Sequence, residues 1–286
     1  MDKIAIITDS VACLPQELTE QYHIHIVPAG TILFEGKAYR DWLDISPDEA
    51  YHMLESSPEH FSTSATSPTD FLEAYKEASR QADTVIYIAL SSKFSTLYNM
   101  ARVAKELAKE ELPETEIEVF DSRTAAAAQG FMALAAARAT SEGKSLAEMI
   151  AATKKVGDKI NLLYIFETVR YLYRTGRLPK AIANLGSKLN VKPIITVHNG
   201  SAQVHGVARN KKRGVDHLLE FAKEKITGQP VHMAVLHAGA LDEAESLKQL
   251  ISAEFNCVEL WLSQFSPIMA YATGRGVIGI AFYPED

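Results

Sequence analysis

The chain has 286 residues, of which 47% are hydrophobic and 23% are charged, and its formal net charge at pH 7 is −7. This length suits two domains of ordinary size, and the composition is that of a globular protein rather than a disordered one. The acidic balance argues against nucleic-acid binding, which needs a basic surface. The chain has 2 cysteines, too few for a disulfide framework. They fit a reducing compartment, so we expect a cytoplasmic protein.

The apolar segments do not have the form of membrane anchors. The apolar run near the N-terminus, residues 4–7, is too short for a signal peptide. Residues 125–139 are apolar, but Gln129, Gly130 and Arg138 interrupt them. We therefore expect a buried helix there and no stable insertion into a membrane.

Strand and helix patterns alternate through the first half of the chain. The expected strands are residues 4–7, 24–27, 84–90 and 117–120, and the expected helices are residues 14–22, the Ala-rich segment before Gly143, and segments beginning near Ser46, Ser67, Leu97 and Ser145. Ser46 with Glu49, and Ser145 with Glu148, have the spacing of a capping box. Residues 31–34 and the polar segment 35–44 stand outside this alternation. The alternation predicts a parallel sheet with helices on both faces.

The second half has a different pattern. The expected strands are residues 161–166, 191–197, 202–207, 231–236, 258–262 and 277–282, and the expected helices are 211–226 and 241–255, with a helical turn over 167–174. Asn199-Gly200 between two of these strands is a strong hairpin signal, so this sheet is expected to be at least partly antiparallel. We therefore predict an α/β protein with two domains. Residues 1–157 form a domain with a parallel sheet, and residues 158–286 form a domain with a mixed sheet.

A hydroxyl-rich turn follows the buried strand at residues 84–90. Ser91, Ser92, Ser95 and Thr96 lead directly into a helix, and in a parallel sheet this turn lies where open α/β folds bind ligands. Free backbone amides, the helix dipole and the Ser95 hydroxyl can meet one anion there. The alternative is that Ser95 simply caps its helix.

A second hydroxyl-dense segment, residues 62–67, also leads into a helix and includes Thr63 and Ser64. Two such turns in one half of the chain indicate a small, oxygen-rich ligand head group. Four basic residues flank Gly176, namely Arg170, Arg174, Arg177 and Lys180. A guanidinium among them could bind an anion, and the alternative is that they lie at a solvated helix end. The basic cluster at residues 209–213 is interpreted first as a solvated helix start and second as a docking site for a partner.

Several chemistries lack their motifs. Gly274, Gly276 and Gly279 match G-x-G-x-x-G, but a strand pattern follows where a dinucleotide site needs a helix. The sequence has no P-loop, no His-Glu-x-x-His and no Cys-x-x-Cys, so we expect neither a metal nor a cofactor. A hydrolase triad of Ser92, His237 and Asp9 is rejected because no G-x-S-x-G turn presents the serine. The histidines are interpreted as structural. Asp9-Ser10 and Asp121-Ser122 end strands, where they either shape the cleft or cap turns.

In sequence order, these motifs resemble the DegV family of bacterial lipid-binding proteins. The resemblance extends along essentially the whole chain, and the residues that carry it are Thr8-Asp9-Ser10, Thr63-Ser64-Ala65-Thr66-Ser67, Leu90-Ser91-Ser92 with Ser95 and Tyr98, Asp121-Ser122, Tyr171-Leu172 with Arg174, Gly176 and Arg177, Lys192-Pro193-Ile194, His237-Ala238-Gly239 and Thr273-Gly274 with Gly276.

The resemblance implies a two-domain α/β protein that holds one long-chain fatty acid between or beneath its domains and is not itself an enzyme. By position, Thr63 and Ser95 would hydrogen-bond the carboxylate, with the amide of Thr96 as a third donor. Arg177 would lie near the anionic head. The full set of binding residues predicted in this way is Thr63, Ser64, Ser95, Thr96, Arg177, Thr273 and Arg275. Some members of the family present the acid to a fatty acid kinase subunit, which phosphorylates the carboxyl group.

The sequence departs from the family pattern at two places. Thr96 follows Ser95 where the family usually has glycine, which alters how closely the backbone approaches a ligand. Ala272 stands where kinase-linked members carry a histidine, and Arg275 replaces a proline. We expect Arg275 or Arg177 to face the head group, and phosphorylation by a kinase partner to be poor. The alternative function is binding or phosphotransfer of a small hydroxylated ligand, as in dihydroxyacetone kinase subunits.

Overall fold

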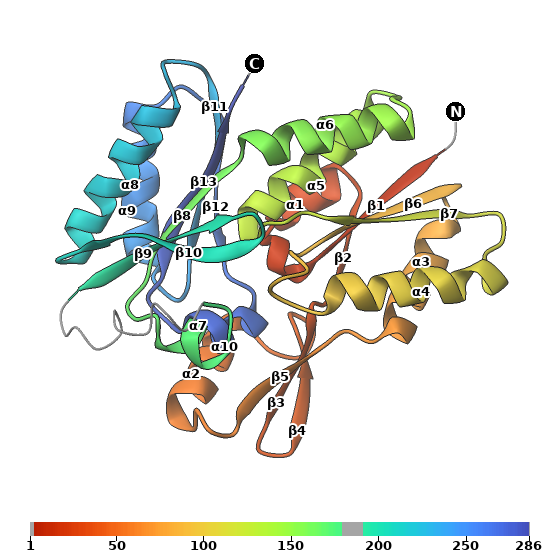
Figure 1. Cartoon of the computed structure of the whole chain (residues 1–286), viewed down its shortest axis with the longest axis horizontal. Coiled ribbons are helices and arrows are strands. Elements are labelled where there is room, and N and C mark those ends of the chain that lie inside the picture. The colour runs from red at the N-terminus through yellow and green to blue at the C-terminus, as the bar shows by residue number, and fades with distance from the viewer. Residues whose placement is uncertain (1–2, 179–190, 286) are drawn as a thin grey trace.

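The computed structural model describes residues 3–178 and 191–285, and its first sheet is parallel (Figure 1). The strand order is β2-β1-β6-β7, and every neighbouring pair runs parallel. Its strands are β1 (Ile4–Asp9), β2 (Ile24–Val27), β6 (Thr84–Ala89) and β7 (Glu116–Asp121). The parallel sheet predicted for the first half of the chain is confirmed. All six residues of β6 are buried, as expected of a central strand that is covered on both faces.

Six helices lie in the described part of the first half, and four begin as predicted, at Ser46, Ser67, Leu97 and Ser145. They are α1 (Gln16–Gln21), α2 (Pro47–Ser56), α3 (Pro68–Ser79), α4 (Leu97–Glu111), α5 (Ala126–Ser141) and α6 (Leu146–Lys159). Capping boxes start α2 at Ser46, α3 at Ser67 and α6 at Ser145. In each, the serine hydroxyl accepts from an amide and an acidic side chain accepts from the serine amide, so two otherwise unpaired donors are satisfied.

The second sheet has six strands in the order β10-β9-β8-β13-β11-β12. β11 and β12 run parallel, and the other neighbouring pairs are antiparallel, so the predicted mixed sheet is confirmed. The strands are β8 (Asn161–Ile165), β9 (Lys192–His198), β10 (Ser201–Ala208), β11 (Val231–His237), β12 (Cys257–Gln264) and β13 (Ile278–Pro284). Asn199 and Gly200 form the predicted turn between β9 and β10, with φ of 49° and 82°. Positive φ at both central residues is characteristic of a type I′ turn, whose backbone twist matches the twist of the two strands in a hairpin.

Helix α5 lies between the two sheets, because it contacts β1 and β6 of the first and β13 of the second (Figure 1). Most of its side chains are buried, which confirms the buried helix predicted from its apolar composition. Close packing requires small residues here: a Cβ at Gly130 would lie 2.7 Å from the carbonyl oxygen of Ala12. None of the helices within residues 3–178 and 191–285 is long and apolar enough to span a membrane.

The outer faces of the two sheets are covered by other helices. α3 and α4 pack on the first sheet, and α8 and α9 pack on the second. The helices of the second half are α7 (Arg170–Arg174), α8 (Lys211–Lys225), α9 (Leu241–Glu254) and α10 (Ala270–Thr273). One hydrophobic cluster between the sheets contains residues from both halves of the chain. The division into domains at residue 157 stays a prediction, and that residue lies inside α6.

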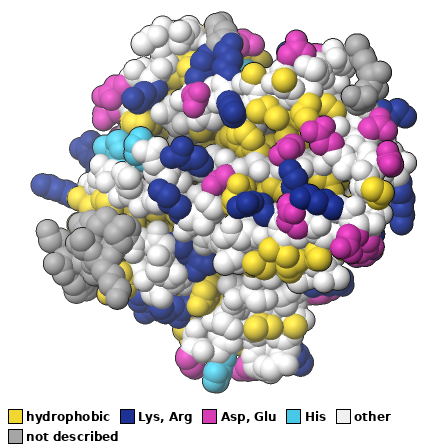
Figure 2. Space-filling view, turned by 45° about the vertical axis from the view of Figure 1, so that its right-hand side comes forward, with side chains coloured by type: hydrophobic (Ala, Val, Ile, Leu, Met, Phe, Trp, Pro, Cys, Tyr) yellow, Lys and Arg dark blue, Asp and Glu magenta, His cyan; other side chains and the backbone are white. Residues whose placement is uncertain are grey.

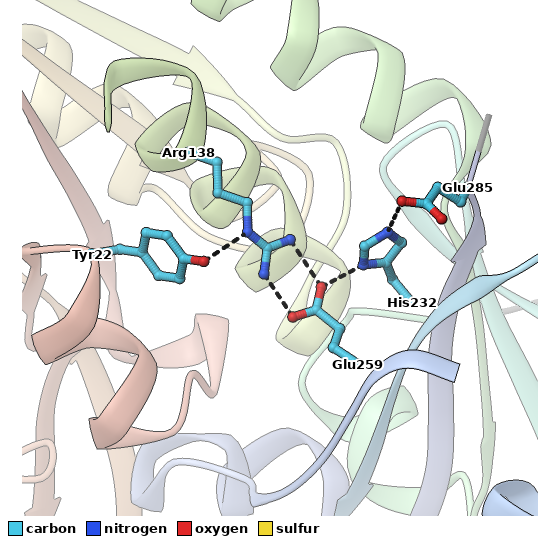
Figure 3. A network of polar contacts seen from close by, with 5 residues as sticks. All are labelled: Tyr22, Arg138, His232, Glu259 and Glu285. Atoms are coloured by element: carbon cyan, nitrogen blue, oxygen red, sulfur yellow. Dashed lines mark hydrogen bonds and ion pairs between the residues drawn. The ribbon is translucent and has the colours of Figure 1, made fainter. Parts of the chain in front are cut away.

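A charged network also connects the two halves (Figure 3). Arg138 of α5 donates to both carboxylate oxygens of Glu259 on β12, at 2.9 and 2.7 Å. Glu259 also bonds to His232 at 2.6 Å, and the imidazole stacks on Tyr283. His232 therefore has the structural role that the sequence analysis expected.

A third, antiparallel sheet of three strands was not predicted. Its order is β4-β3-β5, and it projects from the lower side of the molecule in Figure 1. The strands are β3 (Gly30–Phe34), β4 (Lys37–Arg40) and β5 (Phe61–Ala65). Residues 62–65 therefore lie mainly in a strand and not in the hydroxyl-rich turn that we expected. Thr63 pairs with Ile32 and Ser64 with Thr31, so the alternation of the strand turns the two hydroxyls to opposite faces.

The surface carries both signs of charge. On the face drawn in Figure 2, Lys and Arg side chains are interspersed with Asp and Glu. In the predicted basic cluster, Lys211 pairs with Glu167 and Glu243. Arg213 pairs with Asp216. These pairs offset much of the positive charge of the cluster.

Candidate ligand-binding site

A cavity of about 500 Å³ lies at the carboxyl end of β6 and is lined by residues from both halves of the chain. Every predicted binding residue except Arg275 lines it. They are Thr63 and Ser64 on β5, Ser95 and Thr96 before α4, Arg177 after α7, and Thr273 at the end of α10. The position agrees with the rule that open α/β sheets bind ligands beyond the carboxyl ends of their strands.

Most of the cavity wall is apolar. Side chains from β8, α7, β9 and the segment after β12 form it, among them Leu162, Phe166, Leu172, Ile195, Val197 and Phe265. Sequence analysis did not predict this wall, because its residues come from elements that meet only in the folded protein. Such a lining, with a few polar groups, is typical of sites for apolar small molecules.

The turn between β6 and α4 leaves two amides without partners. The backbone amides of residues 90–94 each donate to an acceptor inside the protein. The amides of Ser95 and Thr96 have no acceptor in the described part of the chain. Both amides lie at the start of α4, where the first amides of a helix have no intrahelical acceptor, so they are available to a ligand that enters the cavity.

Two hydroxyl groups can add to these donors. Ser95 Oγ accepts from the amide of Leu97 at 3.3 Å, so the capping role considered for Ser95 is present. The hydroxyl proton of Ser95 remains free to donate, because a serine hydroxyl both donates and accepts. Thr63 is half-buried, and its hydroxyl makes no hydrogen bond with any residue that the structure describes.

Arg177 brings a positive charge to the cavity. Its Nη1 donates to the carbonyl oxygen of Thr175 at 3.1 Å, and its guanidinium lies 5.8 Å from the ring centre of Tyr271. Within the described residues it forms no ion pair with a carboxylate. Burial lowers the pKa of Arg177, because a desolvated cation without a counter-ion is disfavoured. An anionic ligand would supply the missing counter-charge.

Two aspartates at strand ends hold the turn in place. Asp9 is buried at the end of β1 and accepts from the amide of Leu90 at 3.0 Å, from Tyr87 and Gln129 at 2.8 Å each, and from the amide of Val11 at 3.1 Å. Burial raises the pKa of Asp9. At the end of β7, Asp121 accepts from the amide and the hydroxyl of Ser92. Both interpretations of these residues therefore apply, since the aspartates cap turns and in doing so shape the cavity edge.

The support from Tyr87 and Gln129 was missed by sequence analysis. Gln129 is fully buried on α5, where the surrounding helix is almost entirely apolar. A single amide side chain inside such a helix is the signal that could have identified it, because a buried polar group needs partners.

The structure does not bring Arg275 to the cavity. Its Nε lies 3.0 Å from Glu55 and its Nη1 lies 3.6 Å from Asp48, both on α2, and its guanidinium covers the ring of Tyr51. The acidic side chains of α2 thus hold it away from the proposed head group. Ala272, where the sequence analysis noted a departure from the family pattern, does line the cavity.

The rejected hydrolase triad does not form. Ser92 is hydrogen-bonded to Asp121, and His237 accepts from the amide of Ala240 at 3.3 Å, whereas Asp9 is engaged with Tyr87 and Gln129. Within residues 3–178 and 191–285, no group of three or more His, Cys, Asp or Glu side chains could hold a metal ion. Lys180 lies outside the described residues.

Together, the fold and the cavity define an α/β protein with a largely apolar cavity lined by elements of both halves of the chain. The family model described as an uncharacterised protein family, DegV, matches residues 3–285. The chain belongs to the DegV family, which confirms the resemblance inferred from its motifs.

Relatives in sequence and structure extend over whole chains. A DegV domain-containing protein of Caldanaerobacter subterraneus is 31% identical over 99% of both chains, and Protein DegV of Bacillus subtilis is 30% identical over 98% of both. A structure described as fatty acid binding of a DegV family protein from Thermus thermophilus has a TM-score of 0.90 at 29% identity, and each chain is fully covered. The structure described as DegV, a fatty acid binding protein from Bacillus subtilis, has a TM-score of 0.88 at 29% identity and the same coverage.

Proposed function

We propose that this protein binds a long-chain fatty acid, with the carboxylate at the turn before α4 and the acyl chain against the apolar wall. The observation that carries the proposal is an apolar cavity lined by unpaired hydrogen-bond donors and by Arg177, which has no acidic partner in the described part of the chain. The fatty-acid binding named for the Thermus and Bacillus structures supports it.

The two parts of such a ligand contribute differently. Burial of each methylene is worth about 0.8 kcal/mol, so about 15 of them provide roughly 12 kcal/mol before the costs of binding. A hydrogen bond to a charged group adds about 1.5–3 kcal/mol. The acyl chain therefore supplies most of the affinity, and the donors near Ser95 determine which end of the ligand lies there.

The alternative of a phosphotransfer protein, related to dihydroxyacetone kinase subunits, requires a histidine that holds the substrate. No histidine is among the described residues that line the cavity. The predominance of apolar side chains in the wall also favours an acyl chain over a small hydroxylated compound.

Native mass spectrometry of the purified protein, followed by lipid extraction, tests the proposal. We expect a bound fatty acid of about 14–18 carbons, since apolar cavities of this size accommodate such chains. Denatured protein should have the mass of the bare chain. A bound sugar-like compound, or protein that fails to take up added palmitate, would contradict the proposal.

Presentation of the acid to a fatty acid kinase subunit is a finer proposal that comes from the family resemblance. Ala272 lines the cavity but offers no side-chain donor to a developing acyl phosphate. We therefore expect poor phosphorylation of the bound acid, and faster transfer in Ala272→His. The rate of acyl-phosphate formation is measured for both proteins with the kinase subunit and ATP. Equal rates would show that Ala272 does not limit phosphorylation.

A further inference from the structure

The hairpin of β9 and β10 forms one wall of the cavity, and its tip lies beyond the residues of β9 that pair with β8. Ile195 and Val197 of β9 and Ala202 of β10 line the cavity. β9 pairs with β8 over residues 194–196, and the amide of Phe166 donates to the carbonyl oxygen of Pro193 at 2.9 Å. β10 is the edge strand. The tip of the hairpin therefore extends past its support toward the first half of the chain (Figure 1).

Two hydrogen bonds join this tip to the first half within the described residues. Ser91 Oγ donates to the carbonyl oxygen of Gly200 at 2.8 Å, and the guanidinium of Arg123 donates to Asn199 at 3.1 Å. The contact is close, because a Cβ at Gly200 would lie 2.7 Å from Ser91 Oγ. Gly200 has a φ of 82°, so glycine is favoured here for both space and conformation.

Ser91 belongs to the same turn as the free donors of the site. It is fully buried, and its Oγ also accepts from the amide of Lys93 at 3.3 Å. Its carbonyl oxygen accepts from Phe94, and its amide donates to Thr124. One side chain thus connects the hairpin wall to the turn that carries the unpaired amides of Ser95 and Thr96.

We propose that Ser91 is a positioning residue that fastens the β9–β10 hairpin over the cavity, and that release of this contact admits and discharges the acyl chain. The inference rests on the proposed function, because it concerns how a fatty acid reaches the cavity. A ligand that bridges the turn and the hairpin wall stabilises the fastened form, and the fastened form in turn retains the ligand.

A reversible cross-link gives the sharpest test. A Cβ at Gly200 would lie 3.7 Å from the Cα of Arg123, so Arg123→Cys with Gly200→Cys brings two thiols close enough for a disulfide. The side chain introduced at residue 200 displaces the Ser91 hydroxyl in both redox states. The reduced and oxidised forms of this one variant therefore differ only in whether the hairpin tip is covalently fastened. The variant is loaded with a fluorescent fatty acid while reduced and then oxidised, and its release to excess vesicles of phosphatidylcholine is followed. We expect release at least about tenfold slower in the oxidised than in the reduced state. Wild type treated with the same oxidant should be unchanged.

The second variant opens the contact instead of locking it. Ser91→Ala should both load and release the fluorescent acid about five- to tenfold faster, as expected from loss of one hydrogen bond. Since both rates rise, Kd should change less than either rate. Ser246→Ala is the matched control, because that hydroxyl also donates to a backbone carbonyl, on a helix without cavity-lining residues.

The outcomes separate the two proposals. If mass spectrometry shows the cross-link formed and release is equally fast in both redox states, the hairpin is not the entry route. A Ser91→Ala protein with weaker binding, unchanged loading and faster release would show a role in the site rather than in entry. If the reduced double variant and wild type both fail to bind fatty acid, the proposed function itself is wrong.

Discussion

Arg177 gives the prediction that depends most directly on the geometry of the site. Arg177→Gln removes the positive charge from the cavity but keeps a polar side chain with hydrogen-bond donors. Because the guanidinium is desolvated without a carboxylate partner among the described residues, the charge destabilises the ligand-free protein. We therefore expect the ligand-free variant to be at least as stable as wild type and to bind fatty acid more weakly.

The size of the affinity loss follows from the interaction removed. A hydrogen bond between charged groups contributes about 1.5–3 kcal/mol, so Kd for palmitate should rise about 10- to 150-fold. The corresponding alcohol has no charge for the guanidinium to neutralise, and its Kd should change by less than about threefold. A loss of affinity that is confined to the acid indicates an electrostatic contact between Arg177 and the head group.

Binding is measured by displacement of a fluorescent fatty acid, and stability by thermal unfolding of delipidated protein. Arg174→Gln is the matched control: its guanidinium lies 5.5 Å from the same Tyr271 ring, but its side chain is exposed and does not line the cavity. The reasoning fails if Arg177→Gln weakens acid and alcohol equally, or if Arg174→Gln weakens the acid as much as Arg177→Gln does.

Three further predictions concern the turn and the titrating groups. Ser95→Ala should weaken acid binding by about 1–2 kcal/mol and alcohol binding by less; equal losses in the displacement assay would assign the hydroxyl to capping alone. Asp41 accepts from Ser10 and from the amide of Ile268 at 2.8 Å, and burial raises its pKa from 3.8 to about 6. The folded protein therefore binds more protons between these values, and its stability falls as pH rises through this window. Asp41→Asn should be more stable than wild type by about 3 kcal/mol at pH 7. The prediction is wrong if the free energies of unfolding of the two proteins change in parallel between pH 4 and 7. For Glu259, burial raises the pKa, but the bonds from His232 and Arg138 outweigh it and lower the pKa below 4.5. The resulting stability is present above pH 4.5 and lost as pH falls. Glu259→Gln should cost about 3 kcal/mol at pH 7 and progressively less as pH falls through the lowered pKa of Glu259, and a cost that does not change with pH would refute the pairing.

The alternation of strands and helices could be predicted because each element carries its own pattern. The β6 strand is uniformly apolar and the Asn199-Gly200 turn has residues suited to positive φ, so neither depends on distant contacts. The three-stranded sheet was missed because residues 62–65 and 37–40 are polar and short. Their strand conformation depends on pairing with β3, and propensity alone favours a turn for such sequences.

The candidate site was predictable where a side chain acts near its own position in the sequence. Ser95 and Thr63 belong to local motifs, and both reach the cavity. The position of Arg275 depends instead on Glu55, which is 220 residues away in the chain, and no local pattern indicates that contact. The same holds for the apolar wall, because its members come from strands and loops of the second half that meet the first half only after folding.

The donors near Ser95 explain how the proposed ligand and the protein would stabilise each other. In the free protein, two amides and the guanidinium of Arg177 have no acidic partner among the described residues, and burial withholds part of the guanidinium from water. A carboxylate pairs with these groups at once, while its acyl chain displaces water from the apolar wall. Ligand binding therefore raises the stability of the protein by mass action, in proportion to the logarithm of ligand concentration over Kd. The acyl chain determines how large this stabilisation is, and the fixed donors determine that an acid gains more than an alcohol of equal length.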